Sequence, residues 1–527
     1  MTNTGDATAT APEARSTDEL PAEESDDRNA NRSTTPESEG FKSFIFGGWA
    51  ERDEPAPTPR EQAAYAAARR ERVSAEFPGQ RLIIPAGDVK QRANDTDYPF
   101  RAHSAFAHLT GWGADSEPGA VLVMEPTGEA GHAATVYFRE RAGRDSEEFY
   151  ANAAIGEFWI GPRPSLAHVA ADLRVATKGI AEFDRVIDAV DTATLVVREA
   201  DAALTERVDH ARLRFAAEAA LSTNASDAPF SLEVNAEHEP DAELARVLSE
   251  LRLVKDEYEI AELRAAVDAT ERGFAEVLAE LPRITSEVRG ERVIEGVFAT
   301  RARLDGNDVG YASIAAAGPH ATILHWTRND GPVVPGDLVL LDAGVERDSY
   351  YTADITRTFP VNGTFSPVQR QVYEAVLEAA DAAFRVVRPG AIFREVHAAA
   401  MAVIARKTAE WGFLPVSAEE SLKPEHQFHR RYMVHGTSHH LGLDVHDCAQ
   451  ARRTLYMDGV LEPGMVFTIE PGLYFQPDDL TVPEEFRGIG VRIEDDIVVT
   501  ADGAENLSAG IPRTADEVEA WVRGARR

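Results

Sequence analysis

Four carboxylates and one imidazole follow one another through the last third of this 527-residue chain. They are Asp342 in L-L-D-A-G, Asp354 in A-D-I-T-R-T, His439 in G-T-S-H-H-L-G, Glu470 in T-I-E-P-G and Glu494 in V-R-I-E-D-D. Two divalent cations bring about four positive charges into a small volume, which four carboxylates can balance, and a carboxylate can bridge two ions. The set is therefore typical of a two-metal hydrolase, in which a water molecule attacks a carbonyl group.

Each of these residues alone is weak evidence, because an Asp at the end of a strand is more often a turn former. Acidic residues inside apolar strands are harder to explain in this way, since a buried charge is costly unless it is paired or coordinated. Oxygen-rich ligands without a thiolate favour hard or borderline cations. We therefore expect two Mn²⁺ ions per subunit, with cobalt, iron or zinc as alternatives.

The carboxylates fall in or beside predicted strands, at 337–344, 352–359, 465–472 and 490–500. Side chains two residues apart in a strand share a face, so Asp354 and Thr356 are expected to point the same way. By the same rule Arg492 shares a face with Glu494, and we expect this guanidinium to steady a carboxylate of the site.

His435 and His439 are four residues apart, like the two zinc-binding histidines of helical metalloproteases. That motif requires a Glu directly after the first His, and Gly436 stands there instead. Gly436 and Thr437 also make a poor helix interior, so the segment is interpreted as a loop or strand entry with His439 as the ligand. His435 is then either a supporting neighbour of the site or a structural histidine.

Longer strings in this region resemble aminopeptidase P, the Xaa-Pro aminopeptidase family of pita-bread metallopeptidases. They are H-G-T-S-H-H-L-G-L-D-V-H-D (435–447), T-I-E-P-G-L-Y (468–474) and V-P-E-E-F-R-G-I-G-V-R-I-E-D-D-I-V (482–498), joined in the N-terminal half by R-A-N-D-T-D-Y-P-F-R (92–101) and F-A-H-L-T-G-W (106–112). The resemblance implies an α+β fold, with a creatinase-like N-terminal α/β domain followed by a pita-bread catalytic domain. It also implies release of the N-terminal residue from peptides that have proline in the second position.

The resemblance further implies a role for each residue of the site. Asp342 is expected to chelate one ion, His439 and Glu470 to hold the other, and Asp354 and Glu494 to bridge them. Catalytic roles are implied for His325, His446, Glu470 and Arg492, and substrate-binding roles for Tyr311 and His435.

Two departures from the family pattern are visible. The gap between Asp342 and Asp354 is one residue longer than usual, and we place the extra residue in the turn at 346–349, because inside a strand it would flip one carboxylate to the wrong face. Trp159 matches a tryptophan that reaches a neighbouring subunit's active site in some family tetramers, but its flanking residues differ. A homo-oligomer, either a dimer or a tetramer, is expected by analogy.

Three other functions are compatible with a pita-bread fold. A prolidase accepts only Xaa-Pro dipeptides, and the match around residues 92–112 favours the aminopeptidase over it. Creatinase does not keep this metal set. Non-catalytic pita-bread binding modules have typically lost metal ligands, whereas all five are present here.

Composition narrows the partners further. The chain has 54 Lys and Arg against 89 Asp and Glu, a net charge of −35, which disfavours nucleic acid and anionic membranes and leaves a peptide as the expected partner. Cys448 is the single cysteine, expected to be a small filler, and its being alone fits a reducing cytoplasm. Neither a signal peptide nor an apolar run of roughly 20 residues is found.

The chain is expected to divide into a disordered acidic tail (1–45), an N-terminal domain (46–240) and a catalytic domain (241–527), with an interdomain region at 228–241. A helix over 63–72 and strands at 81–85 and 119–124 begin the ordered part. An apolar stripe predicts the first long helix of the catalytic domain, and a further helix is predicted over 367–387 with Ser366 as N-cap. The stripe consists of Ile260, Leu263, Val267, Phe274 and Leu278.

Overall fold

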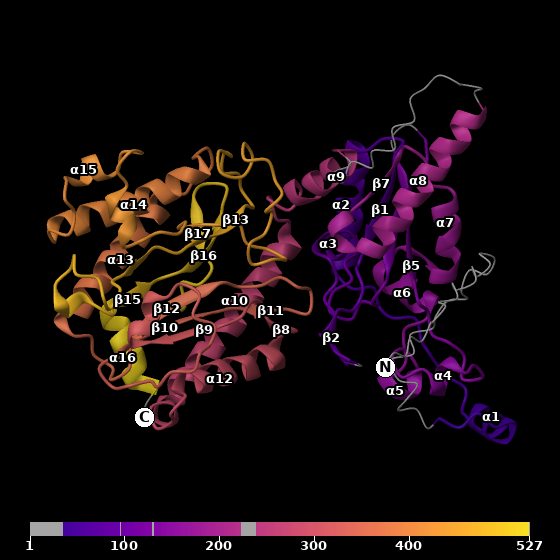
Figure 1. The fold of residues 1–527 in the computed structure, drawn as a ribbon, viewed down its shortest axis with the longest axis horizontal. Helices are drawn as coiled ribbons and strands as arrows, with labels where there is room; N and C mark the ends of the chain where they lie inside the picture. The colour runs from indigo at the N-terminus through magenta and orange to yellow at the C-terminus, as the bar shows by residue number, and fades with distance from the viewer. Residues whose placement is uncertain (1–34, 95, 129–130, 223–238, 526–527) are drawn as a thin grey trace, which may run out of the picture.

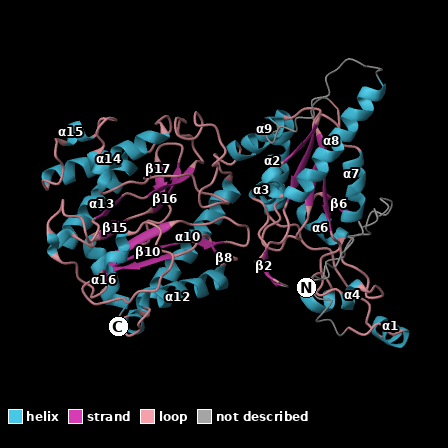
Figure 2. Ribbon diagram, in the orientation of Figure 1, coloured by secondary structure: helices cyan, strands magenta, loops and turns pink. Residues whose placement is uncertain are grey.

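The protein, seen in a computed structural model that describes residues 35–94, 96–128, 131–222 and 239–525, consists of an N-terminal and a C-terminal unit side by side (Figure 1). Helices and strands are mixed in both units (Figure 2). The predicted α+β class is confirmed. Among the described residues, every helix is too short or too polar to span a lipid bilayer.

The N-terminal unit is a mixed sheet with helices on both faces. Alternate residues of its strands point to opposite faces, as the period of two requires: Leu82 packs in one cluster with Val73 and Phe106, whereas Ile83 packs in another with Val208. The strand order is β6 (Ala176–Gly179), β5 (His132–Phe138), β4 (Val121–Pro126), β1 (Arg81–Pro85) and β7 (Thr194–Val196). The helices are α2 (Gln62–Glu76), α3 (Ser104–Thr110), α6 (Leu166–Leu173), α7 (Asp184–Asp188) and α8 (Ala202–Ser222).

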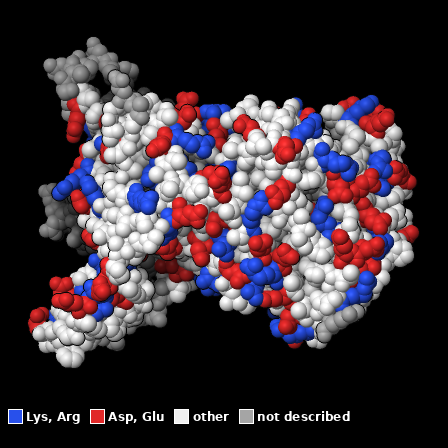
Figure 3. Space-filling model, turned by 180° about the vertical axis from the view of Figure 1, so that it is seen from behind, with Lys and Arg blue, Asp and Glu red and all other residues white. Residues whose placement is uncertain are grey.

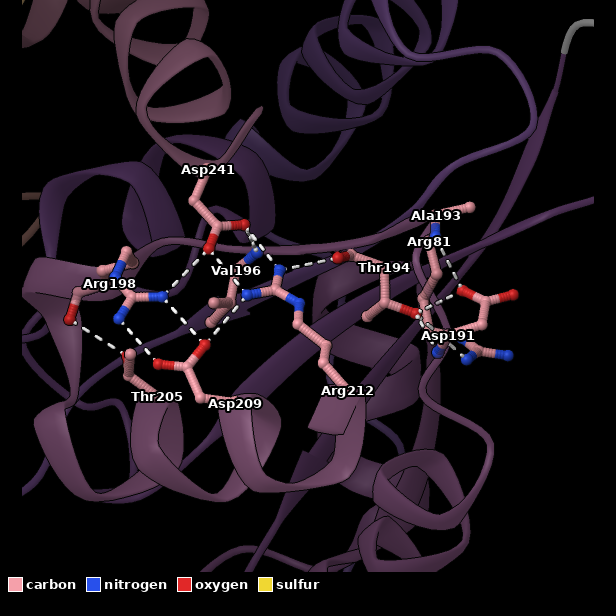
Figure 4. A network of polar contacts seen from close by, with 10 residues as sticks. All are labelled: Arg81, Asp191, Ala193, Thr194, Val196, Arg198, Thr205, Asp209, Arg212 and Asp241. Carbon is pink, nitrogen blue, oxygen red and sulfur yellow. Dashed lines mark hydrogen bonds and ion pairs between the residues drawn. The ribbon is translucent and has the colours of Figure 1, made fainter. Parts of the chain in front are cut away.

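Helix α9 (Glu239–Glu250) is tied to this N-terminal sheet by a buried ion network (Figure 4). Asp241 accepts hydrogen bonds from the Val196 backbone N–H at 2.9 Å and from both Arg198 and Arg212, and the two arginines also contact Asp209. The predicted boundary between the two domains, at residues 240 and 241, falls inside α9, and this helix bonds to both units. Asp241 contacts Arg212 of the N-terminal unit at 2.7 Å, and Glu250 contacts Arg452 of the C-terminal unit at 2.7 Å. The boundary itself stays a prediction.

The C-terminal unit holds short antiparallel sheets between layers of helices. Figure 1 shows α10 and α12 on one side of the strands and α13 and α14 on the other. The sheets are β12 (Ile355–Pro360), β10 (Leu338–Ala343) and β9 (Ile314–Ala317); β13 (Val466–Ile469), β16 (Asp495–Val499) and β17 (Ala504–Asn506); β14 (Gly472–Tyr474) and β15 (Gly490–Arg492); and β11 (Val345–Glu346) and β8 (Asp308–Val309). The main helices are α10 (Glu257–Ala279), α12 (Gly290–Asp305), α13 (Pro367–Val386), α14 (Phe393–Glu410) and α16 (Ala515–Ala525).

Local sequence signals account for the long helices. Asp256 and Glu259 form a capping box at the start of α10, and the predicted stripe faces the core, with Leu263 and Phe274 buried. Ser366 caps α13, and its side chain accepts from the Gln369 backbone N–H at 3.2 Å. Both predicted helices are confirmed.

The turn between β11 and β12 reaches from the catalytic unit to the N-terminal unit. The ladder of β10 and β12 keeps one register from Leu338↔Pro360 to the bridge Glu346↔Thr352, so residues 347–351 form the turn. The turn was predicted at 346–349, but Glu346 belongs to β11, because it pairs with Thr352. The placement of the extra residue in this turn stays a prediction. The carbonyl oxygen of Asp348 accepts from the Ala114 N–H at 2.8 Å, and the Tyr350 hydroxyl accepts from the Ala102 N–H at 3.1 Å. The turn thus helps to hold the two units together.

The beginning of the chain differs from the expected disordered tail where it is described. Residues 1–34 lie outside the described residues, but Glu39–Phe46 form α1, capped by Ser38. Aromatic side chains of α1 pack on the N-terminal unit, with Phe41 and Phe46 both against Tyr150. These ring contacts hold α1 against the N-terminal unit, and the acidic composition of the segment did not predict them.

The interdomain region predicted at 228–241 is described only from Glu239, where α9 begins.

On the face drawn in Figure 3, acidic and basic side chains are interspersed rather than segregated.

Candidate metal centre

The expected metal ligands come from strand ends and strand connections that converge within the C-terminal unit. Asp342 lies in β10, opposite Thr356 of β12, and Asp354 directly precedes β12. Glu470 directly follows β13, and Glu494 lies in the connection between β15 and β16. His439 stands in an irregular segment before the bridge that His440 makes to Phe467. The predicted strand over 490–500 is therefore two strands, and Glu494 occupies the break between them.

Asp354, His439 and Glu494 each offer a donor atom within 4.8 Å of the other two. The Nε2 atom of His439 lies 3.2 Å from Asp354 Oδ2 and 3.7 Å from Glu470 Oε1. The structure thus brings the side chains of Asp354, Glu470 and Glu494 close to His439.

The fifth expected ligand, Asp342, is held by two neighbours. Tyr311 donates to its Oδ1 at 2.7 Å, and Arg492 contacts its Oδ2. Arg492 also donates from Nε to the Thr356 hydroxyl at 3.0 Å, and that hydroxyl donates to Glu494 at 2.6 Å. Arg492 therefore steadies a carboxylate, as expected, but the one it contacts directly is Asp342.

Negative charge is concentrated and buried at this site. Burial raises the pKa of Glu470 to about 7, and burial followed by repulsion from Asp354 raises the pKa of Glu494 well above its usual value. Burial also raises the pKa of Asp342, although Arg492 opposes the shift. By itself burial would lower the pKa of His439, but Asp354 and Glu470 outweigh it and the pKa rises to about 9. Several buried carboxylates that repel one another, with an imidazole among them, fit a site for two divalent cations.

The two histidines expected at the substrate carbonyl, His325 and His446, are both exposed, and His446 contacts a residue of this centre. The His446 ring packs edge-on against His439, with 4.4 Å between ring centroids. Burial lowers the pKa of His446, and the nearby His439 and His325 contribute to the shift. Both histidines are therefore accessible to a ligand.

His435 is a member of the site rather than a distant structural histidine. Its Nε2 lies 2.8 Å from the Tyr474 hydroxyl, and its Nδ1 lies 3.5 Å from Glu470 Oε2. Burial, followed by repulsion from Arg492, lowers the pKa of His435 to about 3, so this imidazole is neutral and can accept a hydrogen bond.

Sequence reasoning did not assign a role to Tyr474 or Thr468, and it placed Thr356 only on the same face as Asp354. Tyr474 links His435 to Arg492, whose Nη1 donates to the phenol oxygen at 3.1 Å. The Thr468 hydroxyl accepts from the His439 backbone N–H at 3.2 Å. A signal was available, because Tyr474 and Thr468 flank Glu470 in T-I-E-P-G-L-Y and Thr356 shares the face of Asp354.

Comparison with known proteins places this geometry in a family. Residues 261–501 match the model of metallopeptidase family M24, and residues 66–197 match that of the aminopeptidase P N-terminal domain. Xaa-Pro aminopeptidase 2 of Streptomyces coelicolor is 52% identical over 92% of this chain and 96% of its own length. Xaa-Pro aminopeptidase 1 of the same organism is 49% identical over 92% of each chain.

Solved structures agree with the sequence relatives. Escherichia coli aminopeptidase P in its low-pH form superposes with a TM-score of 0.74 at 31% identity, covering 88% of this chain and 99% of that one. Pseudomonas aeruginosa aminopeptidase PepP gives a TM-score of 0.73 at 31% identity, covering 89% of this chain and all of that one. The predicted order of an N-terminal domain and a pita-bread domain is confirmed, and the chain belongs to the aminopeptidase P family of M24 metallopeptidases.

Proposed function

We propose that this protein is an Xaa-Pro aminopeptidase, which hydrolyses the bond between the first residue of a peptide and a proline in the second position. The observation that carries the proposal is the cluster of Asp354, His439, Glu470 and Glu494 beside Asp342, in a chain that matches Xaa-Pro aminopeptidases over nearly its whole length. Neither a prolidase nor a non-catalytic module is favoured by these relatives.

We infer that two ions are held by this cluster, with Asp342 on one ion, His439 and Glu470 on the other, and Asp354 and Glu494 shared. When bound, the ions supply Lewis acidity toward a carbonyl oxygen and toward a water molecule. Manganese(II) is the cation we propose, since carboxylates dominate the ligand set; cobalt, iron and zinc are the alternatives to test.

The proposed reaction needs one proton to move from water to the departing proline. The scissile bond is a tertiary amide, so the proline nitrogen must gain a proton to leave as an amine. Glu470 is the residue proposed to take the proton from the attacking water and deliver it to that nitrogen. Its neighbours His435 and His439, at 3.5 and 3.7 Å, hold the carboxylate in place.

The carbonyl oxygen gains negative charge as water attacks. His325 and His446 are proposed to donate hydrogen bonds to it, because both are exposed beside the metal centre. Arg492 is proposed to keep Asp342 oriented, and Tyr311 and His435 to line the place of the substrate.

A peptide panel after metal exchange tests the proposal. Xaa-Pro-Yaa should be cleaved, with manganese giving the highest rate, whereas Xaa-Ala-Yaa should be cleaved poorly. Strict activity on Xaa-Pro dipeptides would make the protein a prolidase, and a purified protein that takes up no metal would belong among the binding modules.

The role of His446 has its own test. His446→Ala should lower kcat about a hundredfold by removing one donor to the developing oxyanion, while metal content stays near two ions per chain. Metal analysis by mass spectrometry alongside kinetics checks both. A loss of bound metal would show that His446 holds an ion instead.

Self-association is proposed through an apolar patch at the far end of the N-terminal unit, where α1, α4 (Glu148–Ala151) and α5 (Glu157–Ile160) lie together (Figure 1). Phe44 is 81% exposed and Trp159 is 55% exposed, and Phe158 and Ile160 beside Trp159 are exposed as well. Trp159→Ala should shift the molar mass measured by light scattering toward the monomer. An unchanged molar mass would show that the patch is not part of the interface.

The cytoplasmic location of the protein stays a prediction.

A further inference from the structure

The loop that carries His325 is organised around one buried carboxylate, that of Glu291. This loop, residues 318–331, connects β9 to the segment that leads into β10 and is here called the His325 loop. Glu291 lies in the first turn of α12 and is fully buried, with 0% of its surface exposed. A buried carboxylate is costly unless its oxygens are hydrogen-bonded, so its partners show what it stabilises.

Both oxygens of Glu291 have two partners each, spread over the whole loop. Oε1 accepts from the Ala317 backbone N–H at 2.8 Å and lies 2.7 Å from His320 Nδ1. Oε2 accepts from the indole N–H of Trp326 at 2.9 Å and from the Gly331 backbone N–H at 2.7 Å. The start, the middle and the end of the loop are therefore fixed to a single side chain.

Packing around Glu291 leaves little room for adjustment. The rings of His320 and Trp326 stack at 3.9 Å between centroids with 25° between their planes. A Cβ on Gly331 would lie 2.6 Å from His320 Cε1 and 2.9 Å from Glu291 Oε2, so only glycine permits this approach. At the end of the loop, Asn329 accepts from the Ala315 N–H at 2.9 Å and donates to the Ser313 carbonyl at 2.9 Å.

His325 itself has a different environment. It is exposed, next to Trp326 in the chain, and its backbone carbonyl accepts from the Thr327 N–H at 3.0 Å. The position of the His325 imidazole therefore depends on Trp326, the neighbouring residue, which is anchored to Glu291. A displacement of about 1 Å in a catalytic group can cost about a hundredfold in rate.

We propose that Glu291 is a positioning residue for His325, acting through Trp326 and the two ends of the loop. The inference rests on the proposed role of His325 at the substrate carbonyl. Its chemical requirement is a side chain with two accepting oxygens, because three N–H donors and an imidazole nitrogen converge on them. A glutamine in this place would turn its NH₂ group toward two of those donors.

The test is a set of variants measured for kcat, KM, bound metal and melting temperature. Glu291→Gln should lower kcat by about tenfold or more while two metal ions per chain remain. Trp326→Phe keeps a ring against His320 but lacks the indole N–H, so it should lower kcat in the same direction by a smaller factor. Asp241→Asn is the matched control, a buried multiply bonded carboxylate of the N-terminal unit, and it should lower the melting temperature without changing kcat.

A double-mutant cycle with His325→Ala decides between positioning and general destabilisation. If Glu291 acts through His325, adding Glu291→Gln to His325→Ala should change kcat by less than about twofold. The same factor in both backgrounds, or a wild-type kcat for Glu291→Gln, would overturn the inference. If His325→Ala lowers kcat but Glu291→Gln does not, only the role of Glu291 is refuted. If His325→Ala has the kcat of the parent protein, the proposed role of His325 is refuted, and the role of Glu291 is refuted with it. Should Glu291→Gln fail to fold, the same cycle is run with Trp326→Phe.

Discussion

Two groups of buried and partly buried carboxylates, one in each unit, are stabilised in different ways. In the N-terminal unit Asp209 and Asp241 face Arg198 and Arg212, so two negative charges meet two positive ones (Figure 4). In the catalytic unit the carboxylates of Asp342, Asp354, Glu470 and Glu494 face one guanidinium, that of Arg492, and the imidazole of His439. The first group is neutral within the protein, and the second is not.

The pKa directions follow this difference. Burial would raise the pKa of Asp209, but Arg198 and Arg212 outweigh burial and the pKa lies below its usual value. At the metal centre burial dominates, and the pKa values of Asp342, Glu470 and Glu494 are all raised. An excess of buried acid without arginines to match it is thus what distinguishes a cation site from a structural ion network.

The largest expected effect comes from removing Asp354, which is proposed to be shared by the two ions. Asp354→Ala should abolish turnover, a loss of at least about a thousandfold, because it takes away a carboxylate needed by both cations. Bound metal, measured by mass spectrometry, should fall below two ions per chain. Normal activity with full metal content would exclude Asp354 from the ligand set.

Removing a buried charged group usually lowers the melting temperature of a protein. In the metal-free form of this protein we expect the opposite for Asp354. In the metal-free protein the carboxylates of the centre repel one another, so Asp354→Ala should raise the melting temperature relative to the metal-free parent by roughly 2 °C. Calorimetry after exhaustive chelation measures the difference. A lower melting temperature would mean that the acids of this centre are balanced without cations.

The opposite sign is expected in the N-terminal unit. Asp241→Asn removes the negative charge of a buried side chain that contacts both Arg198 and Arg212. The free energy of unfolding should therefore fall by about 3 kcal/mol. Denaturant titration checks the loss, and metal content and kcat should stay at their parent values. An effect on metal content would show that the two groups are coupled.

A smaller effect is expected from a buried histidine between the units. Burial, followed by repulsion from Arg69, lowers the pKa of His108 from 6.5 to about 4, so the unfolded chain binds a proton in this range that the folded protein does not. Stability should therefore fall as the pH drops from about 6.5 toward 4, at most by about 1.4 kcal/mol per pH unit from this residue.

His108→Gln should make the melting temperature less sensitive to pH between 6.5 and 5 than in the parent protein. Glu259, which lies 3.4 Å from His108, has a lowered pKa, since burial is outweighed by His108 and Arg69, and therefore acts at lower pH. An unchanged pH slope in the variant would show that His108 stays protonated in the folded state.

Much of the site could be predicted because its ligands lie in short strings with distinctive local chemistry. The strand that carries Asp342, the strand that begins directly after Asp354 and the helix that follows Ser366 were visible from periodicity and capping residues. The break in the strand at Glu494 was not, because the alternation in V-R-I-E-D-D-I-V continues through it. Nor was the packing of α9, since the arginines that hold Asp241 are about 30 or more residues away in the chain.

The sequence by itself was enough to propose the candidate ligands and to predict the helices with clear caps, because these depend on residue chemistry and local spacing. Only the tertiary structure decided that Arg492 contacts Asp342, that Tyr474 joins His435 to Arg492 and that Glu291 holds the loop of His325. Such contacts depend on how separate strands and helices pack, and the direction of a buried side chain is set by neighbours that local sequence does not specify.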